Sequence, residues 1–132
     1  MVEASTKSTI LIVEDEPSLR LALSSKFAGE GFAVSEAPDG AVGLTRAIEE
    51  KPSIILLDIL MPIMDGLTML KKLRVDSTYG KDVPVIVLTN VNDDTDIINT
   101  AVTETSPTFF LVKTNWTIQD VVEKVTEIVT PQ

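Results

Sequence analysis

Short runs of apolar and β-branched residues recur five times along the chain, separated by longer stretches with helical periodicity. This alternation is typical of parallel strands joined by helical crossovers. It predicts an α/β fold with a five-stranded parallel sheet. The predicted strands are Thr9–Val13, Ala33–Glu36, Ile54–Asp58, Val85–Thr89 and Thr108–Lys113.

Two of these strands are expected at the centre of the sheet. The runs Ile54–Leu57 and Val85–Leu88 are apolar at every position, as in strands that helices cover on both faces. A buried helix can show such a run, but these runs are only four residues long and end at polar residues. We therefore assign both to strands.

Start signals mark the helices. Pro17 is expected in the first turn of the first helix. Asp39 is expected to cap a helix that runs to about Glu50. Asp65 is expected to cap another that runs to about Val75. In the last helix, apolar residues at three- and four-residue spacing predict one buried stripe. The stripe consists of Ile118, Val121, Val122, Val125, Ile128 and Val129.

Two connections are also predicted. Gly31 stands where the first helix must stop before the second strand, so we interpret it as a C-terminal cap. A glycine-rich phosphate loop would have to follow a strand, and this position does not. The segment Asp76–Asp82 is predicted to be a loosely held loop.

Composition limits the chemistry of the chain. Its 132 residues, 44% of them hydrophobic, suffice for one domain with one core. The absence of histidine and cysteine excludes imidazole bases, disulfides and thiolate metal sites. The formal net charge of −9, without a stripe of Lys and Arg, argues against direct nucleic-acid binding. Chemistry must therefore use carboxylates, hydroxyls, lysine or a bound metal.

The N-terminus is short and polar. Residues 1–8 are predicted to form a disordered tail ahead of a single domain over residues 9–130. The tail leads directly into a strand and contains neither the apolar region of a signal peptide nor a membrane span. A cytoplasmic protein without membrane association is the expectation.

Carboxylates follow two strands that are expected to be neighbours. The first strand is followed by Glu14-Asp15-Glu16, and the third ends in Asp58. In the expected strand order 2-1-3-4-5, both reach the crevice where open α/β sheets bind ligands. Gathered carboxylates are unfavourable without a cation, and Mg²⁺ prefers a few such oxygens plus waters. The sequence therefore predicts a Mg²⁺ cofactor at this edge.

The other strand ends supply what a phosphoryl acceptor needs. Thr89 ends the fourth strand and Lys113 ends the fifth. Asp58 would be the carboxylate nucleophile, the metal and Lys113 would neutralise the transferred oxygens, and Thr89 would hydrogen-bond one of them. Each residue alone is a weak signal, because strand ends are often merely polar. Their joint placement carries the weight.

These residues closely resemble the receiver domain of bacterial response regulators, the phosphorylated switches of two-component systems. The likeness covers about residues 8–130. It implies a flavodoxin-like (βα)5 fold, a three-layer sandwich. The motifs are Ile-Leu-Ile-Val-Glu14-Asp15-Glu16-Pro17, Leu-Leu-Asp58-Ile-Leu-Met61-Pro62-Ile-Met-Asp65-Gly66, Val-Leu-Thr89 and Phe-Leu-Val-Lys113.

The resemblance implies a set of metal ligands. Asp15 and Asp58 would bind Mg²⁺ directly, Glu14 through water, and Leu60 through its backbone carbonyl. Leu60 and Val91 are apolar where polar residues can position the hydrolytic water. We therefore expect the domain to catalyse its own phosphorylation but only slow dephosphorylation, so it is not a conventional enzyme.

The resemblance also implies a switch. Thr89 and Lys113 would contact the phosphoryl group, and Phe110 would change rotamer on activation. Two positions depart from the family's commonest pattern. Asn90 stands where a small residue is usual, and Thr114 where a cis proline is usual. A cis bond without proline costs about 3 kcal/mol, so the loop after Lys113 is either strained or differently shaped.

The implied partners are proteins. The phosphoryl donor would be a sensor histidine kinase or a histidine phosphotransfer protein, since this chain has no histidine. Phosphorylation would shift the population of the fourth helix, fifth strand and fifth helix, and this face would bind a downstream target. The candidate surface comprises Asn92–Thr105, Phe109 and Trp116, and packing of Trp116 against its own domain is an equally open alternative. A monomer and a phosphorylation-linked dimer both remain open.

Two other function classes share parts of this pattern. A haloacid-dehalogenase-type enzyme would carry a general acid where this chain has Leu60, which cannot transfer a proton. A pseudo-receiver, a protein-interaction module that is not phosphorylated, would lack Asp58, the acidic pair or Lys113, and all are present. Asn90 and Thr114 keep the pseudo-receiver open as the alternative.

Overall fold

The structure is a computed structural model that describes residues 8–58, 64–89, 109–112 and 117–129. Strands and helices alternate along the chain as the hydrophobic pattern predicts. The strands are β1 (Thr9–Val13), β2 (Ala33–Ala37), β3 (Ile54–Asp58), β4 (Val85–Thr89) and β5 (Phe109–Val112). The helices are α1 (Pro17–Gly29), α2 (Gly40–Glu50), α3 (Gly66–Asp76), α4 (Thr78–Asp82) and α6 (Ile118–Val129).

The strands pair in parallel, in the order β2-β1-β3-β4-β5. Val13 at the end of β1 lies opposite Ala37 of β2 on one side and Leu57 of β3 on the other. The predicted α/β class and the parallel order 2-1-3-4 of the first four strands are confirmed. The β5 backbone pairs with β4 at the edge of the sheet.

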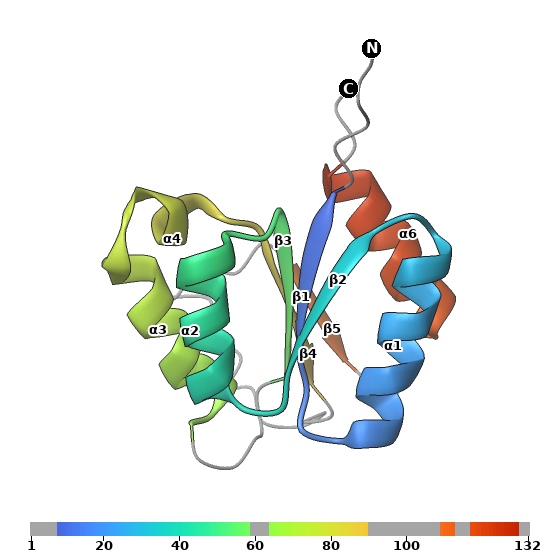
Figure 1. The fold of residues 1–132 in the computed structure, drawn as a ribbon, viewed down its shortest axis with the longest axis horizontal. Helices are drawn as coiled ribbons and strands as arrows, with labels where there is room; N and C mark the ends of the chain where they lie inside the picture. Colours follow the sequence, from blue (N-terminus) through green and yellow to red (C-terminus); the bar gives the residue numbers. More distant parts are fainter. Residues whose placement is uncertain (1–7, 59–63, 90–108, 113–116, 130–132) are drawn as a thin grey trace.

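Helices cover both faces of the sheet, so the molecule has three layers (Figure 1). On β1, Ile10 and Ile12 face the core beneath α1 and α6, whereas Leu11 and Val13 face the core beneath α2 and α3. This alternation follows from the period of two residues along a strand. β3 is buried along its whole length, as predicted for a central strand.

The helices begin where the sequence predicts. α1 starts at Pro17. The carboxylate of Asp39 accepts a hydrogen bond from the N–H of Val42 at 2.9 Å, and Asp65 accepts one from Thr68 at 2.8 Å. Both side chains therefore satisfy backbone donors that a helix leaves unpaired at its start.

The predicted stop of α1 and the stripe of α6 are also confirmed. Gly31 has φ +97°, a conformation that residues with a Cβ rarely adopt, and it follows the last turn of α1. In α6, Val121, Val122 and Val125 are buried in the core that α1 shares. One face of α6 thus packs against the sheet.

The prediction of a loose loop over Asp76–Asp82 is wrong, because α4 forms there. The side chain of Ser77 caps it by accepting from the N–H of Gly80 at 3.1 Å. The Tyr79 hydroxyl donates to the carbonyl oxygen of Pro52 at 2.6 Å, which ties α4 to the turn before β3. Five residues are too short to be helical alone, so tertiary contacts stabilise this turn.

Arg74 also holds the segment around α4 in place. Arg74 Nη1 donates to the carbonyl oxygens of Gly80 at 3.0 Å and Val83 at 2.7 Å. Burial lowers the pKa of Arg74 below its usual value, while nearby Asp82 and Tyr79 act in the opposite direction. One guanidinium thereby pairs two backbone carbonyls near the end of α4.

Several predicted features lie outside the described residues. They are the N-terminal tail, the surface over Asn92–Thr105, the residues Leu60, Asn90, Val91, Lys113, Thr114 and Trp116, and the side chains of Phe109 and Phe110. Within the described ranges, no helix has the length and apolar character needed to cross a membrane.

Candidate functional site

Three carboxylates meet where β1 and β3 end. Glu14, Asp15 and Asp58 each place an oxygen so that all three atoms lie within 4.8 Å of one another. The register explains the meeting: Val13 lies opposite Leu57, so the residues that follow both reach the same edge of the sheet. The sequence prediction that these carboxylates gather is confirmed.

Two of the three carboxylates are almost fully buried. Glu14 is 1% exposed and Asp58 is 3% exposed, while Asp15 is partly exposed. Burying carboxylates close together is unfavourable unless hydrogen bonds or a cation compensate. The partly exposed Asp15 leaves an approach from solvent. The cluster therefore combines an electrostatic need for a cation with a route by which one can enter.

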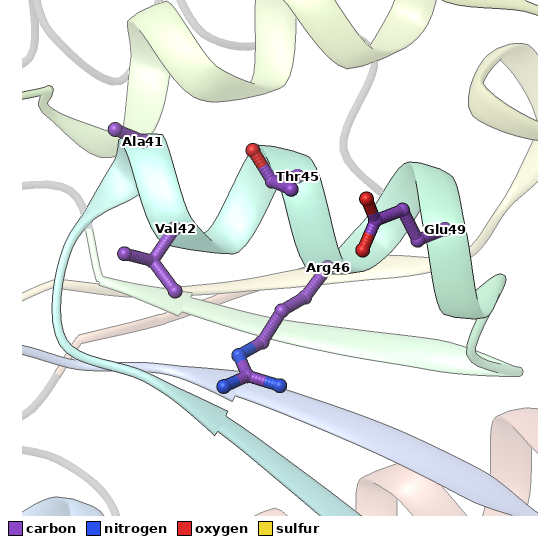
Figure 2. Close-up of a pocket in the computed structure, with 5 residues that line it drawn as sticks. All are labelled: Ala41, Val42, Thr45, Arg46 and Glu49. Carbon is purple, nitrogen blue, oxygen red and sulfur yellow. The ribbon is translucent and has the colours of Figure 1, made fainter.

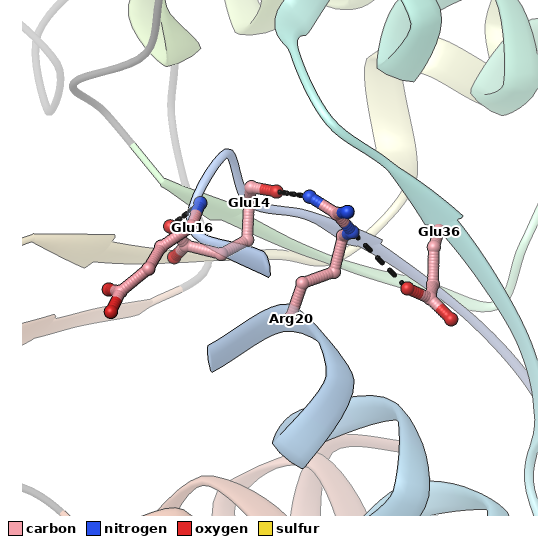
Figure 3. A network of polar contacts seen from close by, with 4 residues as sticks. All are labelled: Glu14, Glu16, Arg20 and Glu36. Carbon is pink, nitrogen blue, oxygen red and sulfur yellow. Dashed lines mark hydrogen bonds and ion pairs between the residues drawn. The ribbon is translucent and has the colours of Figure 1, made fainter. Parts of the chain in front are cut away.

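The loop between β1 and α1 is held by hydrogen bonds that fix Glu14 (Figure 3). The N–H of Glu14 donates to the carbonyl oxygen of Ala37 at 3.0 Å. The Glu14 carboxylate accepts from the N–H of Glu16 at 3.1 Å. The side chain of Glu16 itself is directed away from that carboxylate. Of the acidic triplet, Glu14 and Asp15 thus belong to the cluster and Glu16 supplies backbone.

Sequence reasoning missed Arg20 and Glu36. Arg20 Nη1 donates to the carbonyl oxygen of Glu14 at 2.8 Å, and its Nε pairs with the Glu36 carboxylate at 3.2 Å. A cation one turn into the helix after an acidic triplet was the available signal. The pairing with Glu36 required knowledge that β2 lies beside β1.

The donor set fits a hard divalent cation. Three carboxylate oxygens at one open edge are ligands that Mg²⁺ accepts while it keeps several waters. Cysteine and histidine are absent from the chain, and the three clustered ligands are all carboxylates, so the site is not of the kind that selects zinc or copper. These residues could hold a metal ion.

The other predicted site residues are placed only through the backbone. Thr89 ends β4 and lies one residue beyond Leu88, which is opposite Asp58. Thr89 is in turn opposite Val112, the residue before Lys113. The strand register thus brings the backbone of Thr89 to the edge that carries the carboxylates. The side-chain roles of Thr89 and Lys113 stay predictions.

A separate hollow lies on α2 and does not include the carboxylates (Figure 2). All of its described lining residues come from that one helix, so no second described element closes over it. It therefore lacks the convergent groups of a small-molecule site. The residues are Ala41, Val42, Thr45, Arg46 and Glu49.

Comparison with known proteins identifies the family. The sequence model of the response regulator receiver domain matches residues 10–126, which include the whole carboxylate cluster. The crystal structure of the chemotaxis protein CheY4 of Vibrio cholerae superposes with a TM-score of 0.82 and covers 93% of this chain and 99% of its own. At 24% identity, that likeness shows the fold alone.

Curated relatives agree with the family. The protein ycf27 of Guillardia theta, named as a probable transcriptional regulator, is 38% identical over 97 residues, or 74% of this chain. The DNA-binding response regulator MtrA of Mycolicibacterium smegmatis is 37% identical over 92 residues, or 70% of this chain. The matches cover 37% and 39% of these relatives, so the chain spans well under half of their length.

Proposed function

This chain belongs to the response regulator receiver domain family, and from that premise we propose that it is a phosphorylation-dependent switch whose acceptor is Asp58. The observation that carries the proposal is the cluster of Glu14, Asp15 and Asp58, with the acceptor carboxylate at its buried end. The family supports a role in two-component signalling, in which response regulators partner with histidine kinases.

The proposed reaction transfers a phosphoryl group from a partner's phosphohistidine. A carboxylate oxygen of Asp58 attacks phosphorus, the new O–P bond forms, and the P–N bond to the imidazole breaks. The imidazole nitrogen keeps the bonding electron pair. The donor histidine belongs to a sensor kinase or a phosphotransfer protein, because this chain contains none. Asp58 is held at the end of a buried strand, so fixing its position in the transition state costs little further conformational entropy.

The proposed cofactor is Mg²⁺. Asp15 and Asp58 would be direct ligands, Glu14 would act through water, and the backbone carbonyl of Leu60 would complete the protein ligands. When bound, the ion would neutralise charge on the oxygens of the transferred group. The hydrogen bond from Glu16 holds the Glu14 carboxylate in place for this role.

The proposed switch uses the remaining strand ends. Thr89 would hydrogen-bond the phosphoryl group, Lys113 would pair with its charge, and Phe110 would repack. The proposal includes the complete five-stranded (βα)5 sandwich over residues 9–130, with β5 delivering Lys113 beside β4. Slow dephosphorylation is part of it, because Leu60 and Val91 offer no polar group to orient water.

The proposed output is a changed protein-binding face formed by the fourth helix, fifth strand and fifth helix of the fold. MtrA is named a DNA-binding regulator, but the match covers only 39% of it. For this chain, with a net charge of −9, we propose a protein target and no direct contact with nucleic acid.

The test is intact-protein mass spectrometry after incubation with acetyl phosphate and Mg²⁺. Wild type should gain a single phosphoryl group, while Asp58→Asn and a chelated control should gain none. Glu49→Gln, a carboxylate lost from the exposed face of α2, should behave as wild type. If neither acetyl phosphate nor a phosphorylated histidine donor gives an adduct, the domain is a pseudo-receiver and the proposal is wrong.

A further inference from the structure

We propose that Arg20 is a positioning residue for the metal ligands, acting through the peptide that joins Glu14 to Asp15. The inference rests on the proposed function, because it concerns the same Mg²⁺ site. Arg20 lies on α1, one turn beyond the acidic loop, and its guanidinium reaches back to that loop (Figure 3).

The hydrogen bond from Arg20 holds the peptide plane between Glu14 and Asp15, which contains backbone atoms of the second ligand, Asp15. Arg20 Nη1 donates to the Glu14 carbonyl oxygen at 2.8 Å. This carbonyl belongs to the peptide unit that includes the N and Cα atoms of Asp15. A peptide unit is rigid, so holding its oxygen restricts the positions of the N and Cα atoms of Asp15, and through them its side chain. The N–H of Glu14, in the preceding peptide unit, donates to Ala37 at 3.0 Å. The backbone of the ligand loop is thus held on both sides of Glu14.

The guanidinium is itself oriented. Its Nε pairs with Glu36 Oε1 at 3.2 Å while Nη1 binds Glu14, so two nitrogens of one planar group have fixed partners. Glu36 belongs to β2, the neighbour of β1 in the sheet. The side chain of Arg20 is 21% exposed and that of Glu36 is 42% exposed, so the ion pair contributes little energy by itself. What the ion pair contributes is orientation: it holds the Arg20 guanidinium so that Nη1 points at the Glu14 carbonyl oxygen.

The charge of Arg20 also suits this position. Glu14, Asp15 and Asp58 carry like charges within a few ångströms, and their repulsion favours opening of the loop when no cation is bound. A hydrogen bond from a charged donor to the loop backbone resists that opening. Without Arg20, metal binding would have to regather ligands that had moved apart. The expected loss is therefore in metal affinity, as for other groups that orient ligands.

The test measures Mg²⁺ affinity by isothermal titration calorimetry on wild type, Arg20→Ala and Arg20→Lys. We expect Arg20→Ala to weaken Mg²⁺ binding about tenfold, and Arg20→Lys to lie between it and wild type because an ammonium lacks the planar fork. With acetyl phosphate, the Mg²⁺ concentration for half-maximal phosphorylation should rise similarly, while the rate at saturating Mg²⁺ should approach that of wild type.

Arg46→Ala is the matched control. Arg46 pairs with Glu50 at 3.1 Å on the partly exposed surface of α2. It lines the separate hollow on that helix (Figure 2). Its Mg²⁺ affinity should equal that of wild type. If Arg20→Ala binds Mg²⁺ within about twofold of Arg46→Ala, the positioning role is wrong and the proposed function stands. If wild type itself does not bind Mg²⁺, the metal part of the proposed function fails, and this inference with it. Should Arg20→Ala not fold, Arg20→Lys decides on the same criterion.

Discussion

At each end of the sheet an arginine donates to backbone carbonyl oxygens, but the two arginines have different surroundings. Where the strands end, Arg20 holds the carbonyl of Glu14 beside a group of buried carboxylates. Where β3 and β4 begin, Arg74 holds the carbonyls of Gly80 and Val83 at the end of α4. One end gathers like charges, and at the other end Arg74 and the Tyr79 hydroxyl bond to neutral backbone carbonyls.

The difference separates function from stability within one fold. At the α4 end, hydrogen bonds join neutral carbonyls to a cation and a hydroxyl, so each contact favours the folded state. At the carboxylate end, repulsion works against the folded state until a cation binds. Substitutions at the two ends should therefore change stability and metal binding independently, and three of them test this.

The largest effect is expected from Gly80→Ala at the α4 end. A Cβ on Gly80 would collide with the backbone carbonyl oxygen of Leu73, which cannot move away without displacing α3. We expect the free energy of unfolding to fall by about 3 kcal/mol, measured by urea denaturation. Gly29→Ala is the control, because a Cβ there meets nothing within 4 Å. Mg²⁺ affinity should remain that of wild type in both variants, and a loss in folded Gly80→Ala would show that the two ends are coupled.

The second effect has the opposite sign. In the presence of a chelator, Asp58→Asn should raise the free energy of unfolding by roughly 1–2 kcal/mol, because it removes one of three crowded negative charges. Saturating Mg²⁺ should stabilise wild type and not the variant. Thermal unfolding with and without Mg²⁺ measures both. Glu49→Gln makes the same charge change on the exposed face of α2 and should be neutral. A metal-free Asp58→Asn protein less stable than wild type would mean that Asp58 serves the fold.

The smallest effect is expected from Tyr79→Phe. The change removes the 2.6 Å hydrogen bond to Pro52 and should cost about 1 kcal/mol at neutral pH. Burial raises the pKa of Tyr79 above its usual 10.0, with Arg74 acting weakly against this. As pH rises past 10, the unfolded chain releases this proton first, so wild-type stability should fall further than that of the variant.

Urea denaturation across alkaline pH measures this difference. Tyr79 is the only tyrosine, so tyrosinate absorbance reports its ionisation directly. Parallel pH dependences for wild type and Tyr79→Phe would contradict the role of this hydroxyl. Mg²⁺ affinity, measured at neutral pH, should again be unchanged, since α4 lies at the other end of the sheet from the carboxylates (Figure 1).

The sequence located the carboxylates because their positions follow from local rules. Glu14 and Asp58 directly follow or end apolar strands, and parallel strands present their ends at one edge. The helix caps Asp39 and Asp65 were likewise visible, because a cap bonds only to residues two or three positions away. Predictions of this kind succeeded.

The failures involve partners far apart in sequence. Nothing near Tyr79 indicates that its hydroxyl meets the carbonyl of Pro52, 27 residues earlier, so the local sequence predicts a loop where α4 forms. Nothing near Arg20 indicates Glu36, 16 residues later on an edge strand. Each partner became identifiable only once the strand order was known.

The class of fold, the strand ends where chemistry can occur and the types of group available there all follow from the amino-acid sequence. Hydrophobic periodicity, helix caps and strand-end carboxylates are local properties, so they can be identified without knowing how the elements pack. Tertiary structure alone decided which backbone carbonyls each arginine holds and that residues Thr78–Asp82 are helical. The physical reason is that an isolated turn or a surface ion pair is marginal in water, so its geometry is set by whatever distant group packs beside it.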